Sequence, residues 1–299
     1  MNELILTSLE QGLIFSVLAM GVVLTYKVLD IADLSVEGTF PLGAFVFARF
    51  VMGGANPLMS TLLAFAFGAG AGLVTALLFV KLKIRPLLSG ILTMTMLYSF
   101  NLRLNGKANI PLFSSGTIYP EGYRLLVLIG AIILVKLVLD WFLKTETGYL
   151  LIATGDNESL VRSLGENSNK YKILGFMLSN GLVATSGAMM AQYQGFADIT
   201  MGSSIIVVAL ASIIIGETLG KSSGKMSLTL RAIIGAMTYK LIGGVAIDMG
   251  LSPTDLKAIS AIIVIAFISY NNFSSPVINS LKKRGGKTIA GNKKPLEEF

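Results

Sequence analysis

The chain has 299 residues, of which 53% are hydrophobic and only 14% are charged, whereas about 25% of the residues of an ordinary soluble domain are charged. Together with a mean hydropathy of +0.73, this composition excludes a water-soluble enzyme and indicates an all-α protein that crosses a membrane several times. The sequence contains no cysteine and no histidine, which excludes disulfides, thiolate or imidazole catalysis and nearly all zinc or copper sites. We therefore expect neither catalytic residues nor a metal site.

The net charge of +7 raises the question of a nucleic-acid partner. Lysine and arginine, however, are concentrated in the connections between hydrophobic segments and in the C-terminal tail. This distribution is typical of membrane orientation signals, so we expect no nucleic-acid partner.

Hydrophobic stretches near 20 residues predict six membrane-spanning helices, at about 5–26, 58–80, 123–143, 170–193, 226–248 and 255–271. Three further apolar stretches are short or interrupted and predict broken, tilted or re-entrant helices, at about 37–50, 85–102 and 203–216. Irregular backbone survives at membrane depth only where protein buries it or where it lines a cavity. The expected architecture is one membrane domain of about nine segments over 1–280, followed by a basic tail over 281–299.

The basic residues predict the orientation of these segments. Nine segments with the N-terminus outside place four connections on the cytoplasmic side together with the C-terminus, namely those that begin at Lys27, Lys81, Lys144 and Glu217. Most lysines and arginines between the segments fall in these connections and in the tail, as the positive-inside rule requires. Small residues within two segments predict close helix packing, at Gly68, Gly70 and Gly72 and at Gly181, Ser186 and Gly187.

The stretch GETLGKS over 216–222 is similar to a phosphate-binding loop. It has three residues between its glycines, where the Walker A loop has four, and it follows a membrane segment rather than a strand. We therefore expect this chain to bind no ATP and no other cofactor.

A short helix is predicted in the cytoplasmic loop over 154–172. An acidic or amide residue can cap its start, a further acidic residue suits its dipole, and a glycine can end it. Its apolar stripe cannot be buried within so short a loop, so either a partner surface or the lipid headgroups must cover it. The residues concerned are Asp156, Asn157, Glu158, Leu160, Val161, Arg162, Leu164 and Gly165.

Polar side chains on apolar helices, such as Asn180 and Gln192, need an internal partner or a wet cavity. Glu37 opens the segment that contains Pro41, and it can cap that helix or serve a proton relay. Because the short segments are expected to line a cavity, the candidates for a solute path are Glu37, Thr39, Phe40, Thr93, Met96, Tyr98 and Asn101.

Four runs carry a resemblance to a known family: VEGTFPLGA over 36–44, and the stretches 90–112, 153–198 and 252–264. They resemble bacterial permeases of ABC importers, in the group of the branched-chain amino acid and ribose permeases, and are most similar to the tryptophan/tyrosine transport permeases. The resemblance spans about 30–270.

The resemblance implies a transport subunit in the bacterial cytoplasmic membrane rather than an enzyme. Its partners would be a second permease copy, two cytoplasmic ATPase subunits that bind ATP and Mg²⁺, and an extracytoplasmic substrate-binding protein. The family's coupling helix, whose apolar stripe enters a groove on the ATPase, maps onto 156–165. The implied substrate is a small solute. An aromatic amino acid is the first candidate, and a branched-chain amino acid or another small solute such as a nucleoside remains open.

An ion-coupled secondary transporter remains the alternative. Such a carrier needs an ion site at mid-membrane, usually built from carboxylates. Glu37 and Asp248 lie at the ends of predicted segments, whereas the charged residues within segments are the cations Lys136, Arg231 and Lys240.

Overall fold

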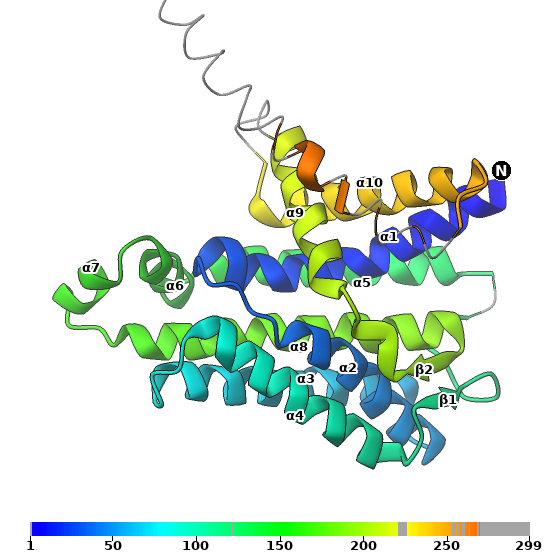
Figure 1. Cartoon of the computed structure of the whole chain (residues 1–299), viewed down its shortest axis with the longest axis horizontal. Helices are drawn as coiled ribbons and strands as arrows, with labels where there is room; N and C mark the ends of the chain where they lie inside the picture. The colour runs from blue at the N-terminus through cyan, green and yellow to red at the C-terminus, as the bar shows by residue number, and fades with distance from the viewer. Residues whose placement is uncertain are drawn as a thin grey trace, which may run out of the picture.

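The computed structural model describes residues 2–120, 122–220 and 226–252, together with residues 255, 258, 261–262, 264–267 and 269. Helices make up almost all of it (Figure 1). In chain order the elements are α1 (Asn2–Val23), the π-helical turn η1 (Leu24–Val28), α2 (Val36–Met52), α3 (Pro57–Val80), α4 (Pro86–Asn105), β1 (Asn109–Pro111), α5 (Arg124–Leu143), α6 (Glu146–Asp156), α7 (Glu158–Ser163), α8 (Ser168–Gln194), β2 (Phe196–Asp198), the 3₁₀ turn η2 (Ile199–Gly202), α9 (Ile205–Gly220) and α10 (Leu228–Asp248).

Five of the six predicted spanning segments are confirmed as helices long and apolar enough to cross a membrane. They correspond to α1 with η1, α3, α5, α8 and α10. The structure describes the sixth, 255–271, only in part, and the tail over 281–299 lies outside the described residues. The count of nine segments and the outside N-terminus stay predictions.

The three segments predicted to be short or broken form unbroken helices. The helix α2 continues through Pro41 for 17 residues, and α4 has 20 residues. With η2, α9 makes a sixth candidate span of 22 residues, Ile199–Gly220, and the interruption lies just before α9, where Ser204 has a φ of 65°. Irregular backbone is instead found in η1 and in the non-helical stretch 29–35 that follows it, where Asp30 has a φ of 56°.

The packing of Gly202 against α2 accounts for the proline inside this helix, Pro41. A proline has no backbone N–H, so the helical bond to the carbonyl four residues earlier, that of Glu37, is not made. Gly202 packs there so closely that a Cβ on it would lie 1.9 Å from Glu37 O. The prediction that Glu37 caps this helix is wrong, because the helix begins at Val36 after Ser35, and Glu37 lies in the first turn.

The centre of the protein is α8, which contacts α1, α2 and α3 (Figure 1). Its small residues allow backbone to meet backbone. A Cβ at Gly187 would lie 1.9 Å from Phe40 O, and one at Gly43 of α2 would lie 1.8 Å from Ala184 O. The predicted close packing is confirmed at Gly181 and at the two glycines of α3 that lie four residues apart, Gly68 and Gly72.

Gly70 does not follow this pattern, because nothing lies within 4 Å of a Cβ built on it. Residues two apart on a helix face in nearly opposite directions, so Gly70 points away from α8 when Gly68 and Gly72 face it. Ser186, the remaining small residue of the set, donates a hydrogen bond from Oγ to Ile14 O of α1 at 2.9 Å. The contact between α8 and α1 therefore includes an interhelical hydrogen bond in addition to close packing.

The two ends of the molecule differ. At one end lie α6 and α7, and at the other lies the two-stranded antiparallel sheet of β1 and β2, in which Asn109 faces Asp198 (Figure 1). These two strands are the exception to the predicted all-α fold. The predicted cytoplasmic connections at Lys27 and Glu217 do lie together, since Lys27 Nζ is 2.8 Å from Glu217 Oε1.

Candidate functional site

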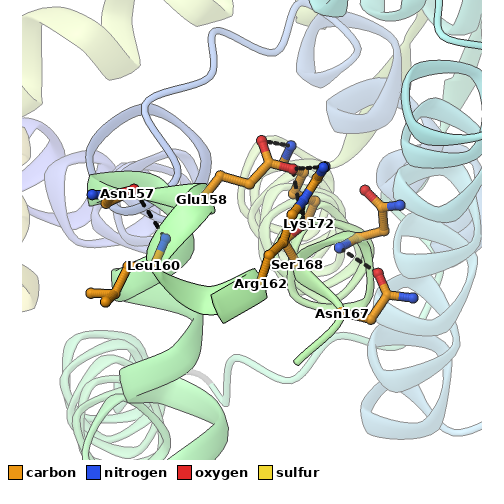
Figure 2. Close-up of polar contacts among 8 residues, drawn as sticks. Asn157, Glu158, Leu160, Arg162, Asn167, Ser168 and Lys172 are labelled. Carbon is orange, nitrogen blue, oxygen red and sulfur yellow. Dashed lines mark hydrogen bonds and ion pairs between the residues drawn. The ribbon is translucent and has the colours of Figure 1, made fainter. Parts of the chain in front are cut away.

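The short helix predicted in the loop over 154–172 is present as α7. Asn157 caps it: its side-chain oxygen accepts a hydrogen bond from Leu160 N at 3.1 Å (Figure 2). Gly165 follows the helix with a φ of 83°, the left-handed conformation that ends many helices. The predicted boundaries are too wide, because Asp156 is the last residue of α6 and α7 itself covers only Glu158–Ser163.

Glu158 fastens α7 to the start of α8. Its carboxylate forms ion pairs with Arg162 Nη2 at 2.5 Å and Lys172 Nζ at 2.8 Å, and it accepts a hydrogen bond from Ser168 Oγ at 2.9 Å (Figure 2). The bond from Lys172 above all, with those from Ser168 and Arg162, lowers the pKa of the Glu158 carboxyl to about 2, against the opposing effect of partial burial. The carboxylate is therefore ionised throughout the physiological range, and α7 is held in one orientation.

The predicted apolar stripe of α7 divides between inside and outside. Val161 is fully buried and belongs to the main hydrophobic core, so it anchors the helix. Leu160 and Leu164 have 51% and 65% of their surfaces exposed, and the Leu160 side chain points away from the Glu158 ion pairs (Figure 2). What α7 presents outward is thus two leucines rather than three apolar residues.

The helices on either side of α7, α6 and α8, are themselves packed against other parts of the protein. Lys172 also lies over the ring of Phe79 at the end of α3, 5.3 Å from its centroid. The preceding helix α6 rests on η1 without a side chain between them, since a Cβ at Gly155 would lie 1.8 Å from Val28 O. Ion pairs therefore join α7 to α8, α8 contacts α3 through Lys172 and Phe79, and α6 packs directly on η1.

The residues predicted to line a solute path are divided between buried and exposed positions. Thr39 and Phe40 are buried in the core, where Thr39 Oγ1 donates to Asn180 Oδ1 at 2.7 Å. On α4, Thr93 and Asn101 face α2, while Met96 and Tyr98 are exposed on opposite sides of the helix. Glu37 is half-buried in the first turn of α2.

Two atoms between α2 and α4 lack partners among the described residues. Asn101 Nδ2 donates to Gly38 O at 3.3 Å, but Asn101 Oδ1 and Thr93 Oγ1 are buried without a hydrogen bond. Most buried polar atoms in native proteins are hydrogen-bonded. Among the residues that the structure describes, the contact of α4 with α2 therefore leaves two buried oxygen atoms without a hydrogen bond, and on α8 Gln194 Oε1 is in the same position.

Sequence reasoning missed a buried polar cluster beside α8. Asp33, in the stretch between η1 and α2, accepts hydrogen bonds from Ser35 N at 2.8 Å, Ser35 Oγ at 2.6 Å and Asn180 Nδ2 at 2.8 Å. The available signal was an asparagine within an apolar helix, which demands a polar partner. The partner itself could not be identified, because 147 positions separate Asp33 from Asn180.

Gln192 is a second polar residue of α8 whose partners the structure identifies. Its Nε2 donates to Thr61 Oγ1 of α3 at 3.0 Å, and its Oε1 accepts from Ile118 N at 2.9 Å. Within the described part of the chain, no group of three or more Asp or Glu could hold a metal ion. Asn180 and Gln192 of α8 thus join that helix to its neighbours through hydrogen bonds.

The chain matches known transport permeases over nearly its whole length. The family model described as "Branched-chain amino acid transport system / permease component" matches residues 4–280. A tyrosine transport system permease protein from Clostridioides difficile is 45% identical over 286 residues, which cover 95% of this chain and 96% of that protein. The ribose import permease protein RbsC of Escherichia coli is 26% identical over 276 residues, which cover 88% of this chain and 84% of that protein.

A solved structure shares the fold. PsaBC from Streptococcus pneumoniae, determined in complex with a Fab, superposes with a TM-score of 0.51 at 14% identity, over 88% of this chain and 89% of that one. The helical membrane fold and the full-length sequence match therefore agree. This chain belongs to the family of permease components of branched-chain amino acid transport systems.

Proposed function

We propose that this protein is the membrane subunit of a bacterial ABC importer for an amino acid, with aromatic amino acids as the first candidates. The observation that carries the proposal is the 45% identity, along almost the full length of both chains, to a protein named as a tyrosine transport permease. The chain would work in the cytoplasmic membrane with two ATPase subunits, which bind ATP and Mg²⁺, and with an extracytoplasmic binding protein that delivers the substrate.

We assign ATPase docking to α7. Two features support this role: Leu160 and Leu164 are exposed on a helix outside the membrane spans, and ion pairs hold that helix firmly on α8. Exposed leucines on a helix held in one orientation favour docking into a groove of a partner protein over contact with lipid, because a helix that only rests on lipid needs no fixed orientation.

The solute path is placed along α4, between two permease copies. Met96 and Tyr98 are both exposed on α4, but residues two apart on a helix face in nearly opposite directions, so one of them would line the path. Thr93 and Asn101 on the α2 side would change partners as α4 moves, as their unsatisfied atoms suggest. Of single cysteines at Met96 and Tyr98, one should react with a water-soluble thiol reagent to an extent that depends on nucleotide. A cysteine at Leu134, exposed on α5, is the lipid-facing control, and equal protection of all three positions would contradict the path.

A permease pair is required because each chain supplies one half of the translocation unit, and we expect two identical copies. Native mass spectrometry of the complex purified with its ATPase should show two copies of this chain. A one-to-one pair of different permeases would contradict the homodimer.

The function is tested by uptake into liposomes that contain the complete complex. We expect ATP-dependent uptake of labelled tyrosine that exceeds uptake of leucine and of ribose and that requires the binding protein. The alternative is an ion-coupled carrier, for which the buried Asp33 carboxylate is the obvious ion ligand; its acceptor atoms, however, are already hydrogen-bonded to Ser35 and Asn180. Uptake by this chain alone, driven by an ion gradient and without the ATPase, would establish that alternative.

A further inference from the structure

A pocket opens at the end of the molecule opposite α7. It has a volume of about 800 Å³ and is formed by the last turns of α2 and α4, by α3 and by β1. Figure 1 shows β1 at the end away from α6 and α7, so the orientation proposed above places this pocket on the extracytoplasmic side. We call it the Arg49 pocket, after the arginine in the last turn of α2 that lines it.

Two cations line the Arg49 pocket without an acidic partner in the part of the chain that the structure describes. Arg49 and Lys107 are both exposed, and neither forms an ion pair with a described carboxylate. The acid on the adjacent strand, Asp198, already accepts hydrogen bonds from Asn109 Nδ2 at 2.8 Å and from Thr200 N at 2.8 Å. The pocket therefore presents two positive charges available to an anion.

The other walls are largely apolar and include two aromatic rings and one amide. Phe50 and Phe67 both line the pocket, with ring centroids 6.3 Å apart and ring planes inclined by 58°. Asn105 donates from Nδ2 to Phe45 O at 2.9 Å, which fixes the amide and leaves its oxygen as an acceptor. Cations for a carboxylate, an amide oxygen for an ammonium group and two rings for an aromatic side chain are the contacts that an aromatic amino acid requires.

We propose that the Arg49 pocket is the site at which the permease first binds the aromatic amino acid that the extracytoplasmic binding protein delivers. Arg49 and Lys107 bind its carboxylate, Asn105 accepts a hydrogen bond from its ammonium group, and Phe50 and Phe67 contact its ring. The inference rests on the proposed function for the class of substrate, and it adds a binding site to a subunit whose α7 end only transmits movement.

Ligand-observed saturation-transfer NMR tests the site directly, with the permease in phosphatidylcholine nanodiscs and L-tyrosine as the probe. Tyramine, which lacks the carboxylate, and glycine, which lacks the ring, are the matched ligands. A charge-assisted contact worth a factor of ten is typical, so we expect the double variant Arg49→Gln with Lys107→Gln to weaken tyrosine binding about tenfold or more. Tyramine should bind the unmodified protein similarly weakly.

Arg103→Gln is the control variant. Arg103 is an exposed arginine in the last turn of α4, near the pocket in sequence, but it does not line the pocket. Its replacement should leave tyrosine binding unchanged, and Arg49→Lys should retain most of it. Size-exclusion profiles and thermal melting of each variant confirm that the membrane fold is intact.

Several results would overturn the inference. Equal saturation transfer to tyrosine and tyramine, or to tyrosine in the double variant, would show that the cations do not hold the carboxylate. Loss of the signal when phosphatidylglycerol is added would assign the pocket to a lipid phosphate, and a variant defect confined to stimulation by the binding protein would assign it to protein docking. ATP-driven tyrosine uptake without any NMR transfer refutes only this site, whereas absence of uptake for every amino acid refutes the proposed function.

Discussion

Replacing Leu164 by Asp should uncouple the permease from its ATPase without disturbing the membrane fold. Leu164 has 65% of its surface exposed and Leu160 has 51%. Complete burial of a leucine side chain contributes about 1.5–3 kcal/mol, so covering the exposed parts of both leucines contributes about 2–3 kcal/mol to docking. That is a factor of about 30–150 in affinity.

An aspartate in the same contact has a larger effect than the loss of a leucine. A carboxylate that loses water without gaining a partner costs several kcal/mol, so Leu164→Asp should weaken ATPase binding by about 100-fold or more. In the free permease the carboxylate remains in water, and insertion and dimerisation should be preserved. The measurement is the ATPase rate of reconstituted complexes with and without loaded binding protein, together with the affinity of the permease for the ATPase.

The chain offers a matched control for this substitution. Leu82 is also 65% exposed and follows α3, outside α7. Leu82→Asp should leave stimulation nearly intact. Unchanged stimulation in Leu164→Asp, or the same loss in Leu82→Asp, would refute the docking assignment and favour a helix that rests on lipid.

Three further predictions concern the fold around these sites. The pKa of Glu158 is about 2 in the folded protein, against an ordinary 4.5, so its ion pairs stabilise α7 above about pH 4.5 and lose this effect as the pH falls towards 2. The melting temperature of Glu158→Gln should therefore lie below that of the unmodified protein at pH 7 and approach it in acid. A difference that does not change with pH would contradict a stabilising role of the ion pairs. Gly43→Ala, whose Cβ would lie 1.8 Å from a backbone oxygen, should destabilise by about 3 kcal/mol or more in thermal melts, whereas Gly70→Ala, in open space, should be neutral or slightly stabilising. Asn180→Ala removes a donor from the buried Asp33 carboxylate and should cost about 3 kcal/mol, measured by melting in detergent; a loss below about 1 kcal/mol would show that water replaces the amide.

The membrane helices and the caps of α7 could be predicted because their signals are local. Hydrophobic length identified α1, α3, α5, α8 and α10, and the two possible capping residues, Asp156 and Asn157, indicated the approximate start of α7. The family could also be predicted from the sequence, because motifs that follow one another in the same order can be compared without a structure. The substrate contacts of a transport subunit have no comparable local signature.

Which face of a helix is buried was decided by the neighbours of that helix. Thr93 and Asn101 are two turns apart and lie against α2, whereas Met96 and Tyr98 on the same apolar helix are exposed. A helix that is apolar all round has no amphipathic stripe by which to choose, so its orientation follows from packing alone. In α7 as well, the packing against neighbouring helices places Val161 in the core and leaves Leu160 exposed.

The sequence by itself determined that the chain is a multi-pass membrane protein, the approximate positions of most of its helices, and its permease family. Only the tertiary structure decided that Asp33 meets Asn180, that Gly43 lies against the backbone at Ala184, and that Arg49 and Lys107 share one pocket. The physical reason is one of range. Hydropathy and capping depend on residues within a few positions of one another, whereas these contacts join segments far apart in the chain, whose relative placement depends on the packing of every helix between them.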